Sequence, residues 1–391
     1  MSEHRGGPAG RHFLQIPGPS NVPDAVLRAM ARPTMDHRGP EFGQMVLGIL
    51  EDLKAVVQTE GPVILYPSSG TGAWEAGLVN TLSPGDRVLA FETGQFATLW
   101  RAVATRMGLE VDWVEGDWRS GVDPSVVEDR LRADSAGAIK AVMVVHNETS
   151  TGVTSRIPEI RAAIDATGHD ALFMVDTISS LGSIDYRHQD WGVDVMVGCS
   201  QKGLMLPPGL GINAVSEKAL AASGALKSTG GGFSRSYWDW QPILERNEAG
   251  YFPYTPPTNL FYGLEVALTR LLNEGLEHVF ARHARHGAAT RAAVGAWGLD
   301  TCCRNPAEHS NSLTAVWLPE GHDADAVRRV HIEARTECGN GPLAHVFVLD
   351  APDHLVEQSF AQGLVRHLHM VDPEIQEHRA QHRHAADKDR L

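Results

Sequence analysis

Short apolar runs, each followed by glycine or polar residues, constrain the fold of this chain more than any other feature. Seven such runs cover residues 62–69, 86–92, 110–117, 138–148, 171–179, 194–202 and 209–216. Helix-like stretches lie between them at 73–82, 97–108 and 155–168. Buried strands separated by helices are typical of a mostly parallel sheet. The sequence therefore predicts an α/β fold with a mostly parallel seven-stranded sheet, in which right-handed crossovers bring the strand carboxyl ends to one edge.

The chain changes character in its second half. Residues 223–258 combine three consecutive glycines with aromatic residues and YFPYTPPTN, which indicates a long irregular segment. A helix is expected over 260–297, followed by a strand, a helix and a strand at 312–319, 323–335 and 345–352. This order favours a smaller α+β domain. The expected parts are an N-terminal arm (1–21), a large domain (22–272) and a small C-terminal domain with a polar tail (273–391).

Composition and charge disfavour several classes of function. The 391 residues include 34 Lys and Arg against 48 Asp and Glu, and the net charge of −14 disfavours nucleic-acid binding. No apolar run reaches about 18 residues, and the first residues lack the apolar core of a secretory signal. The four cysteines form no CxxC pair, so we expect reduced thiols in a cytoplasmic protein without a membrane partner. The tail histidines, which include His378 and His382, lack acidic or cysteine partners, so no metal site is expected.

Four polar features follow the apolar runs where strands are expected to end. The turn 68–72 (SSGTG) could hold a phosphate at a helix N-terminus or could simply open a helix. The second feature is the polar loop 146–152 (HNETSTG), and the third is Asp176, which could face a ligand crevice or cap a helix. The fourth is Lys202, where burial can lower the pKa of the amine and free it for Schiff-base chemistry, although surface lysines are far commoner.

Taken together, these features fit one cofactor, pyridoxal 5′-phosphate (PLP). Lys202 would bond the PLP aldehyde, and Asp176 would keep the pyridine nitrogen protonated. The glycine turn would hold the phosphate. Since each group follows an expected strand, the sheet would bring all three to one edge.

Several segments of the chain resemble the class V aminotransferases of PLP fold type I, in particular the serine–glyoxylate and alanine–glyoxylate transaminases. The likeness runs from about Phe13 to Pro319. Its supporting segments are IPGPSNVP (16–23), PTMDHRGPEF (33–42), SSGTGAWEA (68–76), NTLSPGD (80–86), HNETSTGV (146–153), VDTISSLGSIDYR (175–187), GCSQKGLMLPPGL (198–210), RSYWDW (235–240) and YFPYTPPTNL (251–260). The resemblance implies a PLP-dependent aminotransferase that moves an amino group from a small amino acid, of the serine or alanine type, to an oxo acid such as glyoxylate.

The resemblance also implies roles for individual residues. Lys202 forms the Schiff base and moves the Cα proton, and Asp176 pairs with the pyridine nitrogen. The other implied cofactor-binding residues are Gly70, Thr71, Gly72 and Gln201 at the phosphate, Phe96 stacked on the ring, Thr149 near O3′, Ile178, and Tyr254 and Thr255, of which Thr255 reaches the phosphate of the partner subunit. The residues implied on the substrate side are Pro19, Ser20, Asn21, His37 and Arg38. A phosphate contact that crosses between subunits implies a homodimer with shared active sites.

The C-terminal part departs from this family. Family members carry an Arg-Ile-Gly-His-Leu-Gly motif, whose arginine clamps the substrate carboxylate in bidentate fashion. Aligning the run 346–347 places Val348 where that arginine belongs. Three explanations stay open. Another cation, such as Arg38 or Arg235, takes the carboxylate; or the substrate lacks an α-carboxylate; or a coding shift altered the C-terminus and activity is poor.

Two further functions remain as alternatives to the transaminase. The missing arginine makes credible a PLP enzyme of specialised metabolism that acts on a substrate without the usual α-carboxylate clamp, as a transaminase or as a lyase, decarboxylase or retro-aldol enzyme. A dimeric scaffold that binds PLP without turnover is the other alternative, although the intact Lys202 and Asp176 argue against it. An NAD-binding enzyme is disfavoured because the chain has no G-x-G-x-x-G motif.

Overall fold

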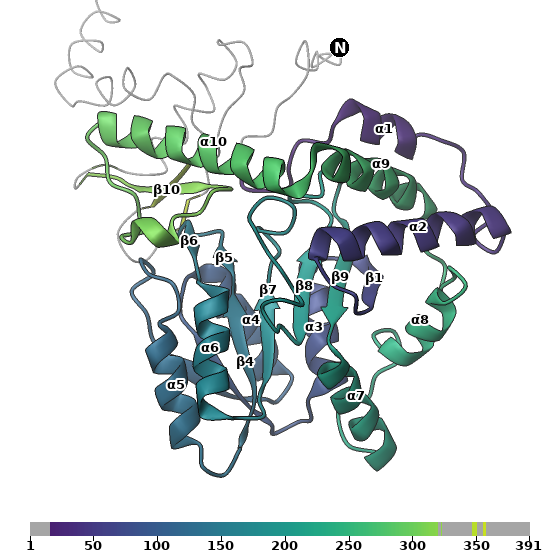
Figure 1. The fold of residues 1–391 in the computed structure, drawn as a ribbon, viewed down its shortest axis with the longest axis horizontal. Coiled ribbons are helices and arrows are strands. Elements are labelled where there is room, and N and C mark those ends of the chain that lie inside the picture. Colours follow the sequence, from purple (N-terminus) through teal and green to yellow (C-terminus); the bar gives the residue numbers. More distant parts are fainter. Residues whose placement is uncertain (1–15, 320–321, 323–345, 350–354, 357–391) are drawn as a thin grey trace, which may run out of the picture.

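A computed structural model describes residues 16–319, 322, 346–349 and 355–356. Helices pack on both sides of a central sheet, and one long helix runs across the top of this body beside a smaller sheet (Figure 1). The strands of the central sheet are β1 (Val63–Ser68), β2 (Arg87–Phe91), β3 (Glu110–Val114), β4 (Ile139–Val145), β7 (Leu172–Asp176), β8 (Val195–Cys199) and β9 (Gly209–Val215). Each matches one predicted apolar run, so the seven predicted strands are confirmed.

The order of the central sheet is β1-β9-β8-β7-β4-β2-β3. Its pairs are parallel from β8 to β3, whereas β9 runs antiparallel to both of its neighbours. The predicted fold class, an α/β protein with a mostly parallel seven-stranded sheet, is therefore confirmed.

Ten helices are described around this sheet. They are α1 (Asp24–Met30), α2 (Pro40–Val57), α3 (Gly70–Thr81), α4 (Gln95–Arg106), α5 (Pro124–Ala133), α6 (Ile157–Thr167), α7 (Glu217–Thr229), α8 (Trp240–Asn247), α9 (Thr258–Glu274) and α10 (Leu276–Ala296), with a 3₁₀ turn η1 at Pro306–Glu308. The sequence reasoning did not predict α1, α2, α5, α7 or α8. It was wrong to treat 223–258 as irregular throughout, because α8 and the end of α7 lie within it.

The predicted single helix over 260–297 is also wrong in one respect. The chain forms two helices there, α9 and α10, separated by Gly275. Gly275 has a φ of +82°, a left-handed conformation that breaks the run of helical hydrogen bonds and that glycine adopts at low cost. Helical spacing of apolar residues continues through this point, so the spacing alone does not reveal the break.

Two apolar layers hold the helices on the sheet. In β4, Val142 and Val144 face the layer formed with α2, α5, α6 and α9, whereas Met143 and Val145 face the layer formed with α3, α4, α7 and α8. All four side chains are at most 4% exposed. Such two-sided burial explains why the strands appear in the sequence as continuous apolar runs rather than as alternating ones.

Two small sheets lie outside the central one. β5 (Asn147–Glu148) and β6 (Val153–Thr154) form a hairpin, and β10 (Thr314–Trp317) pairs in parallel with β11 (Val346–Leu349), which pairs with β12 (Leu355–Val356). The predicted helix 323–335 and the tail histidines lie outside the described residues, and the three-part domain division stays a prediction. Within the part of the chain that is described, no helix is both long and apolar enough to cross a membrane.

Candidate active site

The carboxyl ends of three strands meet at one edge of the sheet. β1 and β8 both run antiparallel to β9, so they point the same way as β7. A Cβ added to Gly70 at the start of α3 would collide with the Ile178 side chain and lie 3.5 Å from Cys199 Cβ. The start of α3 therefore packs directly against the residues that follow β7 and end β8, as the sequence predicted for this edge.

The predicted anion site is the first turn of α3. Ser69 caps this helix, because its Oγ accepts a hydrogen bond from Gly72 N at 3.3 Å. A Cβ on Gly72 would collide with Ser68 Oγ and lie 2.9 Å from the Trp238 ring, so a larger residue there would force these side chains to move. Thr71 is exposed. The backbone N–H groups of this turn and the positive end of the helix are suited to an anion such as a phosphate.

Asp176 is a buried carboxylate at the end of β7, and it is only 3% exposed. Its Oδ2 accepts a hydrogen bond from Trp74 Nε1 at 2.7 Å, and its Oδ1 accepts one from Ile178 N at 2.6 Å. Burial raises the pKa of Asp176 to about 7, and the Glu148 carboxylate adds to this rise; the two hydrogen bonds and the Lys202 charge oppose it. A cationic ring nitrogen placed against this carboxylate would restore its charge.

Lys202 lies in the loop after β8, where the N-terminal arm crosses it. Its Nζ donates a hydrogen bond to Pro17 O at 3.0 Å, and a Cβ on Gly18 would collide with Nζ. Ser20 N donates to Gln201 O at 2.9 Å, and Ser20 Oγ donates to Lys202 O at 2.9 Å. These hydrogen bonds hold the N-terminal arm against the loop that carries Lys202. The arm contains Pro19, Ser20 and Asn21, which were predicted to lie on the substrate side.

Phe96 and Thr149 are positioned by a residue that the sequence reasoning did not single out, Glu148. Its carboxylate accepts hydrogen bonds from Phe96 N at 3.3 Å and from Ala97 N at 3.1 Å, in the first turn of α4. It also accepts one from Ser150 Oγ at 2.6 Å. Glu148 is fully buried, and this burial raises its pKa. It joins the β5–β6 hairpin, which carries Thr149, to the helix that carries Phe96.

The remaining predicted residues lie on the surface or beside β1. Tyr254 is half-buried and donates its hydroxyl to Leu65 O at 3.0 Å. Thr255 and Arg38 are exposed, and His37 is half-buried. These positions leave Thr255 and Arg38 accessible from outside this chain.

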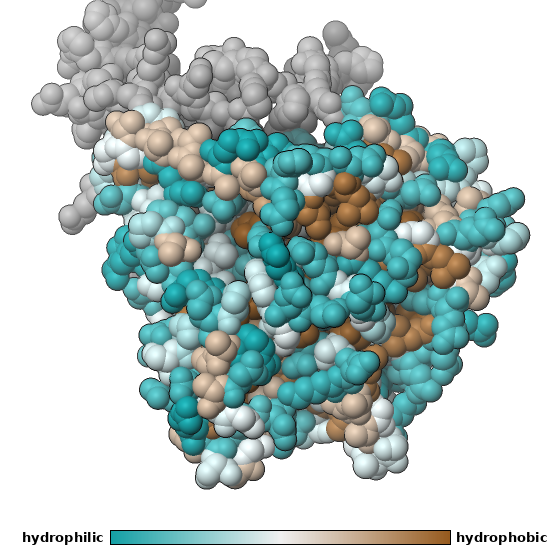
Figure 2. Space-filling view, viewed as in Figure 1, coloured by the Kyte–Doolittle hydropathy of each residue, from teal (hydrophilic) through white to brown (hydrophobic). Residues whose placement is uncertain are grey.

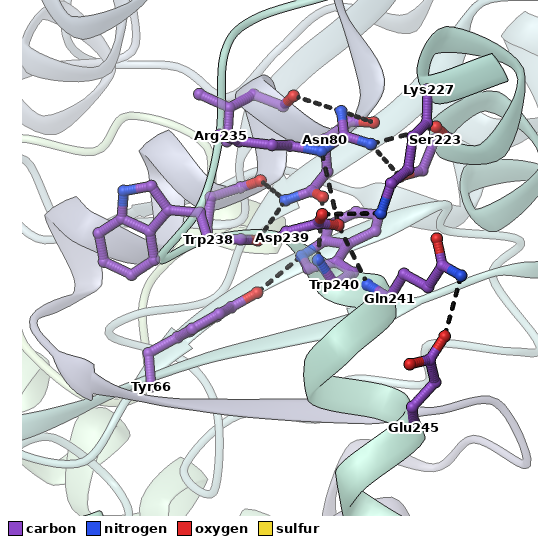
Figure 3. A network of polar contacts seen from close by, with 12 residues as sticks. Tyr66, Asn80, Ser223, Lys227, Arg235, Trp238, Asp239, Trp240, Gln241 and Glu245 are labelled. Atoms are coloured by element: carbon purple, nitrogen blue, oxygen red, sulfur yellow. Dashed lines mark hydrogen bonds and ion pairs between the residues drawn. The ribbon is translucent and has the colours of Figure 1, made fainter. Parts of the chain in front are cut away.

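Arg235 is not available as a substitute for the missing carboxylate clamp. Figure 3 shows its guanidinium turned toward the end of α3, where it donates to Val79 O at 2.9 Å and to Asn80 O at 3.3 Å. It also donates to Ser223 O and Ser223 Oγ, both at 3.1 Å, and Nε lies 3.7 Å from Asp239 Oδ1. The terminal nitrogens of Arg235 therefore join α3 to α7, and its Nε faces the start of α8. The hypothesis that Arg235 binds the substrate carboxylate was wrong.

Trp74 is a second residue of the site that the sequence reasoning missed. It lies in the middle of α3, is 2% exposed, and stacks on Trp100 with ring centroids 5.9 Å apart and planes 12° apart. A buried tryptophan in an apolar helix normally indicates core packing. Only its position four residues after the turn glycine Gly70 could have suggested a place beside the site, since residues four apart share a helix face.

Comparisons with known proteins agree with this geometry. The family model described as Aminotransferase class-V matches residues 12–338. A serine–glyoxylate aminotransferase of Methylorubrum extorquens is 49% identical over 334 residues, 85% of this chain and 83% of that protein. An L-aspartate–glyoxylate aminotransferase of Paracoccus denitrificans is 45% identical and covers 80% of this chain and 78% of that one.

Solved structures give the same result for the fold. An alanine–glyoxylate aminotransferase of Nostoc superposes with a TM-score of 0.77 at 26% identity, covering 91% of this chain and 92% of that chain. The pyridoxamine–pyruvate aminotransferase of Mesorhizobium loti also gives a TM-score of 0.77, at 28% identity, covering 92% of this chain and 87% of that one. With a lysine, a buried aspartate and a glycine turn meeting at the edge of such a sheet, the chain belongs to the class V aminotransferase family and is an enzyme of that family.

Proposed function

We propose that this aminotransferase uses PLP to move an amino group from a small amino acid, serine first among the candidates, to glyoxylate. The observation that carries the proposal is the meeting of Lys202, Asp176 and the first turn of α3 at one sheet edge. Relatives with 45–49% identity are named as serine–glyoxylate and L-aspartate–glyoxylate aminotransferases, which supports this choice of donor and acceptor.

The residues at this edge fit PLP. The helix N-terminus suits a dianionic phosphate, and the buried Asp176 suits a protonated pyridine nitrogen. Gln201 Oε1 is buried and has no hydrogen-bond partner among the described residues, so this side chain is free to bind a ligand. When bound, PLP supplies an aldehyde carbon and a ring that accepts an electron pair.

The chain's own residues would divide the remaining work. Lys202 Nζ, held by Pro17 O, is the amine that carries the proton to and from the substrate carbon. The Asp176 carboxyl group is only 3% exposed, and in such surroundings its charged form would bind a cationic ring nitrogen strongly. Ser20 holds the arm against the lysine loop through its hydrogen bond to Lys202 O.

A lysine substitution with a matched control tests the proposal. Lys202→Ala is expected to lose the visible absorbance of the bound cofactor and to lower transamination of serine and glyoxylate by about a thousandfold or more. Lys218 is the control, because its Nζ also donates to a backbone carbonyl, Ala171 O at 3.0 Å, but at the opposite end of β7. Lys218→Ala is expected to keep both properties. A purified wild-type protein that neither contains nor takes up PLP would contradict the proposal.

A second candidate substrate is an amine that lacks the α-carboxylate. Arg235 is engaged elsewhere, and the alignment of the run 346–347 puts Val348 where the family carries its arginine. If no cation binds the carboxylate, an amine donor or a lyase reaction becomes the better choice. Comparing serine with ethanolamine as donors separates these candidates, because a carboxylate-binding site would favour serine by at least about tenfold.

We also propose that the protein is a cytoplasmic homodimer with shared active sites. Leu27 on α1 and Leu47 on α2 are 46% and 40% exposed. Figure 2 shows hydrophobic residues gathered near α1, α2 and α9, whereas hydrophilic ones dominate over α5 and α6. Apolar surface of this kind is typical of an interface. Cys199, Cys302 and Cys303 are free thiols, which supports a reducing compartment.

A further inference from the structure

The contact between Trp74 and Asp176 joins an α3 side chain to the predicted partner of the cofactor nitrogen. Nε1 of Trp74 lies 2.7 Å from Asp176 Oδ2, a short distance that is typical of a hydrogen bond to a charged acceptor. Both residues are buried, at 2% and 3% exposure, and 102 positions separate them in the sequence. Because the Trp74 ring is stacked on Trp100, the indole N–H is held in place toward the carboxylate.

We propose that Trp74 is a positioning residue, which holds the Asp176 carboxylate in place and stabilises its negative charge for the pyridine nitrogen of the cofactor. This inference rests on the proposed use of PLP. Trp74 and Ile178 N occupy one acceptor position on each carboxylate oxygen, and each oxygen has a second position. The carboxylate can thus keep both donors and still bind a ring N–H.

The charges around Asp176 show why such a donor matters. Burial and the nearby Glu148 carboxylate both favour the neutral form, and Lys202 is the cation that opposes them. Cys199 adds no charge near neutral pH, since burial raises the pKa of its thiol to about 12. Lys202 is also the amine that would bond the cofactor aldehyde. Trp74 and Ile178 N are therefore the hydrogen-bond donors that remain to favour the charged form of Asp176.

Trp100 provides a matched control for the indole N–H. It is buried to the same 2% exposure and forms the other half of the stacked pair. Its Nε1, however, has no hydrogen-bond partner among the described residues. Trp74→Phe and Trp100→Phe remove the same atoms from neighbouring buried rings, but only Trp74→Phe removes a hydrogen bond to Asp176.

The test is PLP binding to the full-length apoprotein, followed by the visible absorbance of the bound cofactor at several pH values. Trp74→Phe is expected to weaken PLP binding by about 10- to 100-fold, and Trp100→Phe by less than about threefold. The fall in affinity toward low pH should begin at a higher pH in Trp74→Phe. In an Asp176→Asn background, where no charge remains to be stabilised, Trp74→Phe should change the affinity by less than about threefold.

Equal losses in Trp74→Phe and Trp100→Phe, with wild type binding PLP, would overturn this inference and leave the proposed function intact. Absence of PLP binding by wild type would instead refute the proposed function and this inference with it. A second measurement does not depend on the folding of Trp74→Phe. In apoprotein labelled with ¹⁵N at its nine indoles, Asp176→Asn should move one indole proton signal upfield, and an unchanged set of signals would contradict the proposal.

Discussion

At the scale of single residues, Asp176 combines two opposed requirements. Under the proposed use of PLP it would carry a negative charge for the cofactor nitrogen, but it lies at 3% exposure, where burial raises its pKa to about 7. The hydrogen bonds from Trp74 and Ile178 N reduce this cost. In the apoprotein burial therefore favours the protonated carboxyl group more than in the unfolded chain, which makes stability depend on pH.

Asp176→Asn is expected to change how the stability of the apoprotein depends on pH. The native pKa of Asp176 is raised above the unfolded value, so the native state binds this proton more tightly. The resulting stabilisation is complete below about pH 4 and is lost as the pH rises through 7. The unfolding free energy of the variant relative to wild type should therefore increase by up to about 4 kcal/mol between pH 4 and pH 8.

Urea unfolding of both apoproteins across this range measures the difference. The exposed Asp170, near the other end of β7, offers a control, and Asp170→Asn should leave the pH dependence unchanged. A difference between Asp176→Asn and wild type that stays constant from pH 4 to pH 8 would show that Asp176 is not perturbed in the apoprotein.

Prediction of these residues from the sequence succeeded where a local pattern existed. Lys202 and Asp176 each follow an apolar run that ends in polar residues, so their place at the sheet edge follows from strand direction. Glu148 and Trp74 gave no such signal. Their roles depend on atoms from α4 and β7, 51 and 102 positions away in the sequence.

At the scale of elements, Arg235 shows how a functional reading of one charged residue can fail. Arg235 lies in a segment that resembles the family, so it was a candidate to bind the substrate carboxylate. Instead it donates hydrogen bonds to carbonyl groups at the C-terminal end of α3. Its terminal nitrogens hydrogen-bond Val79 O, Asn80 O and Ser223, and its Nε faces Asp239 (Figure 3). Since α3 begins at the anion turn, this contact stabilises the helix that carries that turn.

Arg235→Gln is expected to lower the unfolding free energy by about 2–4 kcal/mol, because it leaves the carbonyl groups of Val79, Asn80 and Ser223 without this donor. The KM for the amino donor should stay within about twofold once the folded fraction is accounted for, since Arg235 binds no substrate. Arg38→Gln is the paired variant: Arg38 is exposed, so stability should change by less than about 0.5 kcal/mol. A raised KM in Arg235→Gln with unchanged stability would restore Arg235 as a carboxylate clamp.

At the scale of the whole molecule, one sheet edge collects residues from four parts of the chain. The N-terminal arm, the start of α3, the end of β7 and the loop after β8 meet there. Thr255 and Arg38 are exposed in the single chain, which fits the proposal that part of each active site comes from a second subunit.

Mixing two inactive variants tests this shared site. Lys202→Ala and Thr255→Glu are each expected to be nearly inactive, the second because its carboxylate would repel the phosphate. If Thr255 contributes to the active site of the partner subunit, random pairing makes half of the dimers hybrids. Each hybrid has one site with both Lys202 and Thr255 intact and one site with neither. Refolding the mixture should then recover about a quarter of the wild-type activity. Activity no higher than that of Thr255→Glu alone would place Thr255 in the site of its own chain.

By itself, the sequence determined the set of buried strands, the edge at which they end, and the places of Lys202 and Asp176 at that edge. These are local properties, because a buried strand and the residue that follows it are both recognised from consecutive residues of the sequence. Only the tertiary structure decided what surrounds them: that β9 is antiparallel, that Gly275 divides α9 from α10, that Arg235 closes α3, and that Trp74 faces Asp176. Such pairings depend on how helices pack across a sheet, and distant segments contribute the two atoms of each contact.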